Sequence, residues 1–159
     1  MERRSRLEMI IYFYSRDDDY GWLSNFWRAN QIVDGAVYPT NEHFYQSQKS
    51  IDYTVRGWIR SAPNPFLAMK AGRSLRSGKE LRPDWENLKL GVMEKGLKAK
   101  FFQNEDLKQK LIETGSSLLR ENSPTDMFWG GALNGSKNML GELLMKIRKE
   151  FSVKVGEIQ

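Results

Sequence analysis

The chain has 159 residues with a net charge of +5, 40% apolar residues and no cysteine. This length predicts one domain with its own hydrophobic core, and the apolar and aromatic content excludes an intrinsically disordered chain. The lack of cysteine excludes disulfides and thiolate chemistry and is compatible with a reducing cytoplasm, where we expect the protein. No apolar run approaches the roughly 18 residues that a bilayer span requires, and no signal segment opens the chain, so no membrane partner is expected. The basic excess suits a partner that carries phosphate.

The sequence indicates three segments. We expect a charged N-terminal tail over residues 1–8, one domain over 9–152 and a short C-terminal tail over 153–159. Short strands and turns are predicted before residue 39, and mostly helices after it. No repeat, linker or low-complexity segment divides the chain.

Two stretches before residue 39 have the character of strands. Residues 9–14 are rich in β-forming side chains and predict a short buried strand. Residues 31–38 predict a hairpin, because Asp34-Gly35 suits a two-residue type I′ turn. Between them, residues 20–27 are aromatic but interrupted by Gly, Ser and Asn, which indicates a structured loop. Its large rings either pack beneath the loop or hold a flat ligand.

A polar helix face follows the hairpin. Asn41 is the expected N-cap of a helix that runs to about Ser61. Along this helix Glu42, Gln46 and Lys49 lie three or four residues apart and share one face. Such a face usually turns to water. The alternative is that Glu42, kept ionised by the positive end of the helix, faces a cleft. Another face is expected to bury, and it consists of Phe44, Gln48, Ile51, Val55, Trp58 and Ile59.

The rest of the chain predicts further helices, one strand and one loop. Asn64-Pro65 supplies the cap and first position of a helix that Gly72 is expected to end. A strand over 118–122 is expected to return to the sheet. The Gly-rich aromatic loop 126–138, with Ser136 as a candidate cap, either cradles a phosphate or is simply flexible. Residues 82–85 are expected to open a long helix, and a short helix is expected over 105–114. The final helix is expected over 137–151, with a buried stripe of Leu140, Leu143, Leu144, Ile147 and Phe151.

The residue inventory restricts the chemistry. With His43 as the single histidine and no cysteine, zinc sites and Cys–His or Ser–His pairs lack most of their usual groups. His43 is turned about a quarter turn from Glu42 and is expected to be structural. No Walker A motif occurs, and no G-x-G-x-x-G follows a strand. Carboxylates, Arg73, lysines and tryptophans remain, and these suit acid–base and electrostatic catalysis on a phosphorylated, ring-bearing substrate.

A series of short motifs runs through the chain in a fixed order. They are Phe13-Tyr14 with Tyr20-Gly21, Leu23-Ser24-Asn25-Phe26, Val33-Asp34-Gly35, Pro39-Thr40 with Glu42-His43-Phe44-Tyr45-Gln46 and Lys49, Gly72-Arg73, Arg82 with Asp84-Trp85, Val92-Met93 with Lys100-Phe101, Asp126 with Trp129-Gly130, and Lys137-Asn138 with Leu140-Gly141. Each motif alone is weak, but their order and spacing together are specific. The chain resembles the NADAR family of YbiA-like N-glycosidases over residues 11–151.

The resemblance implies an α+β fold, a mostly helical single domain with a small β-sheet. It also implies an N-glycosidase that cleaves the bond between a ribose phosphate and an amine-bearing base. The substrates of YbiA-like members are phosphoribosylamino-pyrimidine intermediates of riboflavin biosynthesis, whereas other members remove ADP-ribose from guanine in DNA. Both branches stay open here, because Gly131 and its loop depart from the family pattern. The expected partner is thus a phosphorylated ribosylamine or ADP-ribosyl substrate, with nucleic acid only as ADP-ribosylated DNA, and no cofactor or metal is expected.

The resemblance also implies roles for particular residues. Glu42 is the expected catalytic carboxylate, which would stabilise an oxocarbenium-like state and orient the attacking water. Asp126 is the second catalytic candidate, for binding ribose hydroxyls or assisting the leaving amine. Trp85 either stacks on the base or belongs to the core, since it lies on an apolar helix stripe. The other expected substrate-binding residues are Arg73, Lys49 and Lys100 for phosphate, Trp129 for stacking, and Ser24, Asn25, Gly130 and Asn138 for polar contacts.

Two functions of other classes compete with the enzyme. A non-catalytic ADP-ribose or nucleotide-binding module would not need the carboxylate of Glu42, which is present. A basic nucleic-acid binder would carry aromatic rings along strands, whereas the rings here lie in Gly-containing loops.

Overall fold

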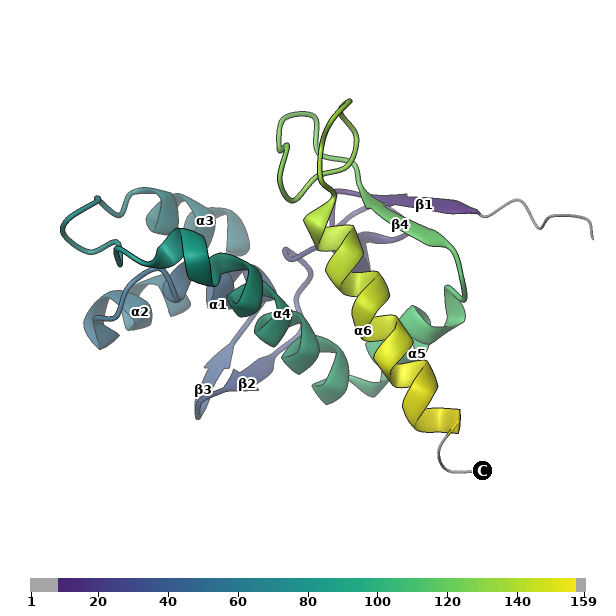
Figure 1. Ribbon diagram of the computed structural model, residues 1–159. Coiled ribbons are helices and arrows are strands. Elements are labelled where there is room, and N and C mark those ends of the chain that lie inside the picture. Colours follow the sequence, from purple (N-terminus) through teal and green to yellow (C-terminus); the bar gives the residue numbers. More distant parts are fainter. Residues whose placement is uncertain (1–8, 157–159) are drawn as a thin grey trace, which may run out of the picture. The chain divides into compact units, whose positions relative to one another are not determined.

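The computed structural model describes residues 9–156 (Figure 1). The α+β, mostly helical fold is confirmed, and the described chain divides into two compact units. The central unit comprises residues 22–108, and the terminal unit comprises the described residues 9–21 and 109–156. The elements are β1 (Ile10–Phe13), the 3₁₀ helix η1 (Gly21–Leu23), β2 (Gln31–Val33), β3 (Ala36–Tyr38), α1 (Asn41–Ser47), α2 (Tyr53–Arg60), α3 (Pro65–Arg73), α4 (Trp85–Gln103), α5 (Glu105–Glu113), β4 (Leu118–Glu121) and α6 (Met139–Gly156).

In the terminal unit, β1 and β4 form a two-stranded parallel sheet. Ile10 pairs with Leu118, and Phe13 pairs with Glu121. Burial alternates along β1, so that Phe13 is buried while Tyr12 is half exposed. The predicted strand over 9–14 is therefore present, but only one of its faces is buried.

Helix α6 packs against β4, beside which it lies in Figure 1. Its predicted stripe is confirmed, because all five side chains are buried: Leu140, Leu143, Leu144, Ile147 and Phe151. The helix continues to Gly156, so that residues 153–156, assigned to a tail from the sequence, are helical. An apolar residue every three or four positions is enough to place one face of this helix on the sheet.

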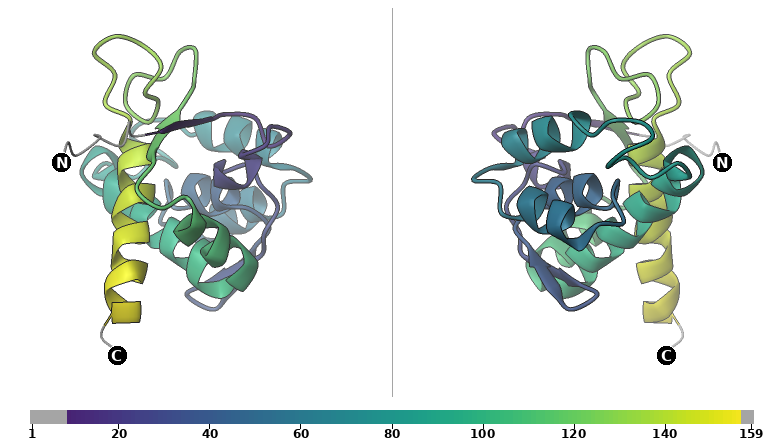
Figure 2. Two further views of the ribbon diagram at one scale, coloured as in Figure 1. Left: turned by 90° about the vertical axis from the view of Figure 1, so that its right-hand side faces the viewer. Right: turned by 90° about the vertical axis from the view of Figure 1, so that its left-hand side faces the viewer.

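The loop between β4 and α6 carries no helix or strand, and in both views of Figure 2 it extends beyond the first turn of α6. Ser136 does not cap α6, since its hydroxyl donates to the carbonyl of Leu133 instead. The helix begins at Met139, and the carbonyl of Asn138 accepts from the N–H of Glu142. The predicted cap was wrong because a local turn bonds the Ser136 hydroxyl first.

In the central unit the predicted hairpin is confirmed. Strands β2 and β3 pair antiparallel, with Val33 opposite Ala36. Asp34 and Gly35 both have positive φ, 50° and 79°, as a type I′ turn requires. After the hairpin, α1 packs against β3, α2, α3 and α4, and all seven of its residues are buried.

The predicted start and end of the helix after the hairpin were wrong. Thr40 is the N-cap, since its side chain accepts from the N–H of His43, and Asn41 is the first helical residue. The helix ends at Ser47, and α2 begins at Tyr53 with Asp52 as its cap. This interruption changes the predicted apolar face, because Ile51 and Trp58 are exposed while Phe44 and Ile59 are buried. A strong cap at Asp52 restarts the helix and overrides the continuous period.

Helix α3 begins as predicted, with Asn64 as cap and Pro65 in the first turn. It ends at Arg73, at the predicted Gly72-Arg73, but Gly72 does not terminate it, because Gly72 is buried inside the last turn. A Cβ at position 72 would meet the side chain of Gln46. Gly72 is therefore explained by the close approach of α3 to α1 and not by termination of the helix.

Candidate active site

Helix α1 places Glu42 in its first turn, inside the central unit. The side chain is 7% exposed, which excludes the arrangement that turns this face to water. Gln46, one turn later, donates from Nε2 to Glu42 Oε1 at 2.7 Å. The backbone N–H of Glu42 donates to the carbonyl of Asn25 at 3.0 Å. The carboxylate is thus held from its own helix, and its residue is anchored to the preceding loop.

Lys49 interacts electrostatically with the carboxylate of Glu42 and with Arg73. Burial lowers the pKa of Lys49, the carboxylate of Glu42 raises it, and Arg73 lowers it again. Glu86 and Lys89 of α4 act on the same amine with opposite signs. Lys49 is half-buried, whereas Arg73 is exposed at the end of α3. We call Glu42, Gln46, Lys49 and Arg73 the Glu42 cluster.

Trp85 belongs to the core of the central unit. It is 6% exposed, and its ring meets the ring of Tyr45 edge to face at 5.1 Å. The Lys49 amine lies 5.8 Å from the ring centre of Tyr45 and 6.0 Å from that of Trp85. Of the two interpretations of Trp85, the core is the one that the structure supports, and its ring helps to place Lys49 beside Glu42.

The loop before β2 contributes through its backbone and through Asn25. Ser24 is buried, and its hydroxyl accepts from the N–H of Phe26, so it shapes the turn. Asn25 Oδ1 accepts from Asn41 Nδ2 at 2.9 Å. Asn41 Oδ1 in turn accepts from Gln31 Nε2 at 3.1 Å. Asn41, taken from the sequence for a cap, is therefore a buried link between the loop and the hairpin.

Lys100 was predicted to hold phosphate, and the structure gives it a different role. Its side chain is fully buried, and Nζ donates to the carbonyls of Trp22 and Ser24 at 2.8 and 2.9 Å. Burial lowers the pKa of Lys100 to about 7. The lysine anchors the aromatic loop from inside, and an amine without exposed surface is not placed to meet a phosphate.

His43 is structural, as expected. It is 1% exposed, its Nδ1 lies 2.7 Å from the hydroxyl of Thr40, and its Nε2 lies 3.0 Å from the carbonyl of Ala62. Because a carbonyl can only accept, Nε2 carries the proton and Nδ1 accepts from the Thr40 hydroxyl. Burial lowers the pKa of His43 further, which favours this neutral form.

The remaining predicted residues lie in the terminal unit, in the loop between β4 and α6. Asp126 Oδ1 accepts from the N–H groups of Phe128 and Trp129 at 2.9 and 2.8 Å. Asn138 Oδ1 accepts from the N–H of Glu121, and its Nδ2 donates to the carbonyl of Leu119. Asp126 therefore shapes the loop itself, while Asn138 holds the loop to β4 and its polar groups are already used by the backbone.

Gly130 and Trp129 complete that loop. Gly130 is buried, and a Cβ there would meet the carbonyl of Asp126 and the carboxyl of Glu121. Trp129 is partly buried, and its ring meets Phe128 edge to face at 4.7 Å. Gly130 is thus a packing requirement of the loop.

Glu121, at the end of β4, was not identified from the sequence. Burial raises its pKa to about 7, the N–H of Ser123 on Oε2 lowers it, and the charge of Asp126 raises it. Its sequence signal is weak, since a single Glu at the end of a strand is common. Only the packing of the loop over its side chain reveals it.

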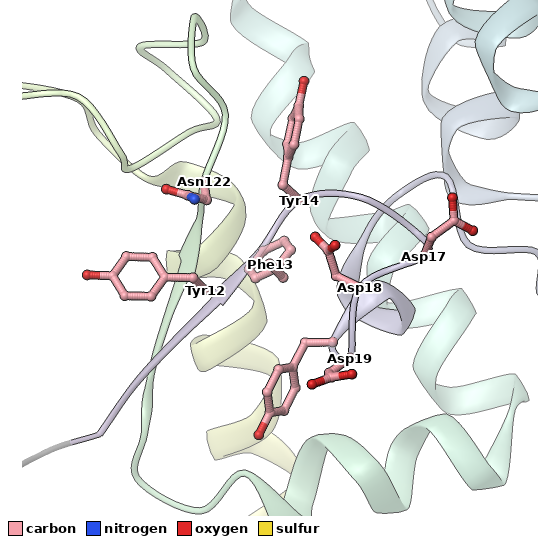
Figure 3. A pocket seen from close by; sticks show the side chains of 8 residues that line it. Tyr12, Phe13, Tyr14, Asp17, Asp18, Asp19 and Asn122 are labelled. Atoms are coloured by element: carbon pink, nitrogen blue, oxygen red, sulfur yellow. The ribbon is translucent and has the colours of Figure 1, made fainter.

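Figure 3 shows a pocket in the terminal unit between β1 and the acidic turn after it. Its volume is about 440 Å³, and Asp18 there accepts from the N–H of Ser15. A second pocket of about 370 Å³ shares Tyr12 and Asn122 and adds Arg120. The first pocket is lined by Tyr12, Phe13, Tyr14, Asp17, Asp18, Asp19, Tyr20 and Asn122. None of the site residues predicted from the sequence lines either pocket.

Residues 9–156 contain neither a cluster of metal ligands nor a membrane-spanning helix. No group of three or more His, Asp or Glu side chains in this range is arranged to hold a metal ion. None of the helices in the same range has both the length and the apolar character to cross a bilayer.

The model of the NADAR domain family matches residues 12–152. The chain belongs to the NADAR family. The N-glycosidase YbiA of Escherichia coli (strain K12) is 42% identical over 147 residues, which cover 92% of this chain and 91% of YbiA. A riboflavin biosynthesis protein of Vibrio vulnificus is 35% identical over 150 residues, which cover 94% of this chain and 40% of that protein. The NMR structure of E. coli YbiA matches with a TM-score of 0.84 and 41% identity, over 94% of this chain and 89% of that one.

Within this NADAR chain eight of the eleven predicted residues fall into two groups, while Asp126, Trp129 and Gly130 lie in the loop between β4 and α6. Glu42, Lys49 and Arg73 come together in the central unit, with Asn25 bonded to the backbone of Glu42. Four others serve the fold in the structure: Ser24, Trp85, Lys100 and Asn138. The first group has the charges that a reaction on a phosphorylated substrate requires.

Proposed function

We propose that this NADAR protein is an N-glycosidase that hydrolyses the bond between a ribose phosphate and an amine-bearing base. Relatives that match nearly all of the chain are named N-glycosidases, which supports the reaction class. The observation that carries the assignment to particular residues is the buried carboxylate of Glu42, held by Gln46, with Lys49 interacting electrostatically with both Glu42 and Arg73.

The chemistry of the bond explains why a fixed carboxylate suits this reaction. As the bond between C1′ and nitrogen lengthens, its electron pair moves to the nitrogen and positive charge develops on the ribose. The carboxylate of Glu42 stabilises this charge and accepts a proton from the water that attacks C1′. The amine leaves with the electron pair and takes up a proton, and ribose phosphate is released with a hydroxyl on C1′.

Arg73 and Lys49 are the proposed phosphate-binding groups. Arg73 is exposed and able to form two parallel hydrogen bonds to phosphate oxygens. Lys49 is partly buried beside aromatic rings, so its amine is confined to a narrow region and contributes a fixed charge.

Asp126 is the second catalytic candidate, in the terminal unit. Its Oδ1 accepts from two backbone N–H groups, which leaves Oδ2 as the atom for a ribose hydroxyl or for the leaving amine. Trp129 beside it is the proposed stacking ring, because it is only partly buried. Both roles stay proposals that depend on the substrate.

For the substrate we propose phosphoribosylamino-pyrimidine intermediates of riboflavin biosynthesis. The name of the Vibrio vulnificus relative supports this branch. A panel of phosphorylated ribosylamines and ADP-ribosylated DNA, followed by product analysis, tests it. Release of ADP-ribose from DNA without turnover of the ribosylamines would assign the chain to the other branch, and binding without any turnover would leave a non-catalytic module.

The decisive variant is Glu42→Gln, which keeps the size of the side chain and deletes its charge. We expect kcat to fall on the order of a hundredfold or more, as for other lost electrostatic stabilisers, with a smaller change in KM. Single-turnover kinetics measures the loss, and a thermal melt confirms folding. Glu105→Gln, the same change at an exposed position, is the matched control and should behave as the parent does. A folded Glu42→Gln variant within a few-fold of the parent would transfer the role to Asp126.

A further inference from the structure

We infer that Gln46 is the positioning residue of the proposed active site: its amide holds the carboxylate of Glu42 in one orientation and favours the charged form. The position of Gly72 on α3 makes room for this amide. This inference rests on the proposed function, since it concerns how the catalytic carboxylate of that reaction is held.

The contact between the two side chains is short and buried. Gln46 Nε2 lies 2.7 Å from Glu42 Oε1, and the two residues are 4% and 7% exposed. A hydrogen bond to a charged acceptor is stronger than one between neutral groups, and it is stronger still away from water. A carboxylate that accepts such a bond is stabilised relative to the protonated acid.

The other end of the amide shows that this orientation is not simply the best way to satisfy Gln46. Its Oε1 is buried, and no donor from the described residues reaches it. A buried carbonyl without a donor is costly, so an amide with a neutral neighbour would rotate to pair this oxygen. Rotation here would direct the carbonyl toward the carboxylate of Glu42 and remove its donor. The charge on Glu42 therefore explains which way the amide faces.

Gly72 of helix α3 fixes the position of the Gln46 amide. A Cβ on residue 72 would collide with Oε1 of Gln46 and would lie 2.8 Å from its Cβ and Cδ. Any side chain at this position would push the amide away from its place against α3. Because Arg73 is the next residue, the same close approach of α3 to α1 brings the phosphate-binding group toward Lys49.

Helices α2, α3 and α4, which pack against α1, carry other charged groups near Glu42 and Gln46. On the segment just after α1 Lys49 is close, α3 supplies Arg73, and α4 supplies Glu86 and Lys89. From α2, Arg56 donates to the carbonyl of Ser50, and Arg60 lies over the ring of Tyr38. The strand β3 carries Tyr38, which packs against Phe44. All of these groups are unchanged in a variant of Gln46, so a shifted pH profile reports the lost amide.

The test is Gln46→Met, which keeps the length of the side chain and removes the donor. We expect kcat to fall on the order of tenfold to a hundredfold with little change in KM, the loss for one hydrogen bond to a charged group. The acidic limb of the kcat profile should move to higher pH, by on the order of one unit, because the ionised carboxylate has lost its donor. A purely structural role would lower the melting temperature and leave this limb in place.

Two further variants test the positioning role of Gln46 if Gln46→Met does not fold. Gln46→Glu has the same size but places a second carboxyl against the first, so the pair retains a proton to higher pH and the acidic limb should move in the same direction. Gly72→Ala should displace the amide and reproduce the kcat loss with Gln46 still present. Gln48→Met, which removes an amide bonded to Ser47 at the end of α1, is the matched control and should leave both kcat and the limb unchanged.

The outcomes separate the positioning role from the reaction itself. A folded Gln46 variant with parental kcat and an unmoved acidic limb overturns the positioning role, while Glu42→Gln still reports on the reaction. If the parent enzyme hydrolyses none of the phosphorylated ribosylamines or ADP-ribosylated substrates, the proposed function itself fails.

Discussion

Two regions, helix α1 and the loop between β4 and α6, bond some of their polar side chains in different ways. In the central unit, polar side chains of α1 bond to other side chains, as in the pairs Gln46–Glu42 and Asn41–Asn25. In the loop between β4 and α6, the side chains of Asp126 and Asn138 bond to backbone groups. Side chains bonded to backbone hold a loop in shape, whereas the carboxylate of Glu42 is held in place by the side chain of Gln46.

The same contrast separates helix α1 from helix α6. Helix α6 buries one apolar stripe and leaves residues such as Glu142 exposed. Helix α1 is buried over all seven residues, although Asn41, Glu42, His43, Gln46 and Ser47 are polar. Burying that many polar groups costs free energy unless they are paired, which they mostly are. Burial of so many paired polar side chains in a short helix is better explained by a role in a functional site than by a contribution to stability.

The comparison predicts that Asn138 acts on stability and not on substrate. Asn138→Ala removes two hydrogen bonds to β4 at a residue with φ of 51°. We expect a loss of about 2–4 kcal/mol in the free energy of unfolding, from the two bonds and the left-handed backbone together. Denaturant unfolding measures this loss, with the exposed Asn134→Ala as control. A stable variant that has lost turnover would show instead that Asn138 contacts substrate.

Arg73→Ala tests whether the Glu42 cluster meets a phosphate. Removing an exposed guanidinium should hardly change stability, but it should weaken binding of ribose 5-phosphate by about 1.5–3 kcal/mol, as for a lost hydrogen bond to a charged group. Calorimetric titration of ribose 5-phosphate and of ribose measures the difference. Lys70→Ala removes an exposed charge one turn earlier on α3 and serves as control. Equal losses for both ligands would remove phosphate recognition from Arg73.

The smallest effect is expected for Glu121 in the terminal unit, where a change of pH tests the comparison between the two units. Its pKa rises from the ordinary 4.5 to about 7 on folding, so the unfolded chain releases the proton first. Stability should therefore decrease as the pH rises from about 4.5 to about 7, and Glu121→Gln should remove this decrease. Melting curves across this pH range should show the melting temperature of Glu121→Gln rising relative to that of the parent as the pH rises. A difference in melting temperature that does not change with pH would mean that burial does not raise the pKa of Glu121.

Several elements follow from local rules and could be predicted from the residues themselves. The Asp34-Gly35 hairpin, the start of α3 at Asn64-Pro65 and the apolar stripe of α6 all follow from turn chemistry, capping and periodicity. Helical spacing likewise grouped Glu42 with Gln46 on one face. These features depend on residues within a few positions of one another, and so a single sequence is sufficient to predict them.

Other features depend on residues far apart in the chain, and packing alone establishes them. Gly72, expected from the sequence to end its helix, is instead in close contact with Gln46 of α1. Lys100 was predicted to bind phosphate, but in the structure it anchors the loop by donating to the carbonyls of Trp22 and Ser24. The approach of Arg73 to Lys49 likewise requires α3 to pack on α1. The type of a residue states which bonds it can make, but the partner that takes them is chosen by packing between segments that no local rule connects.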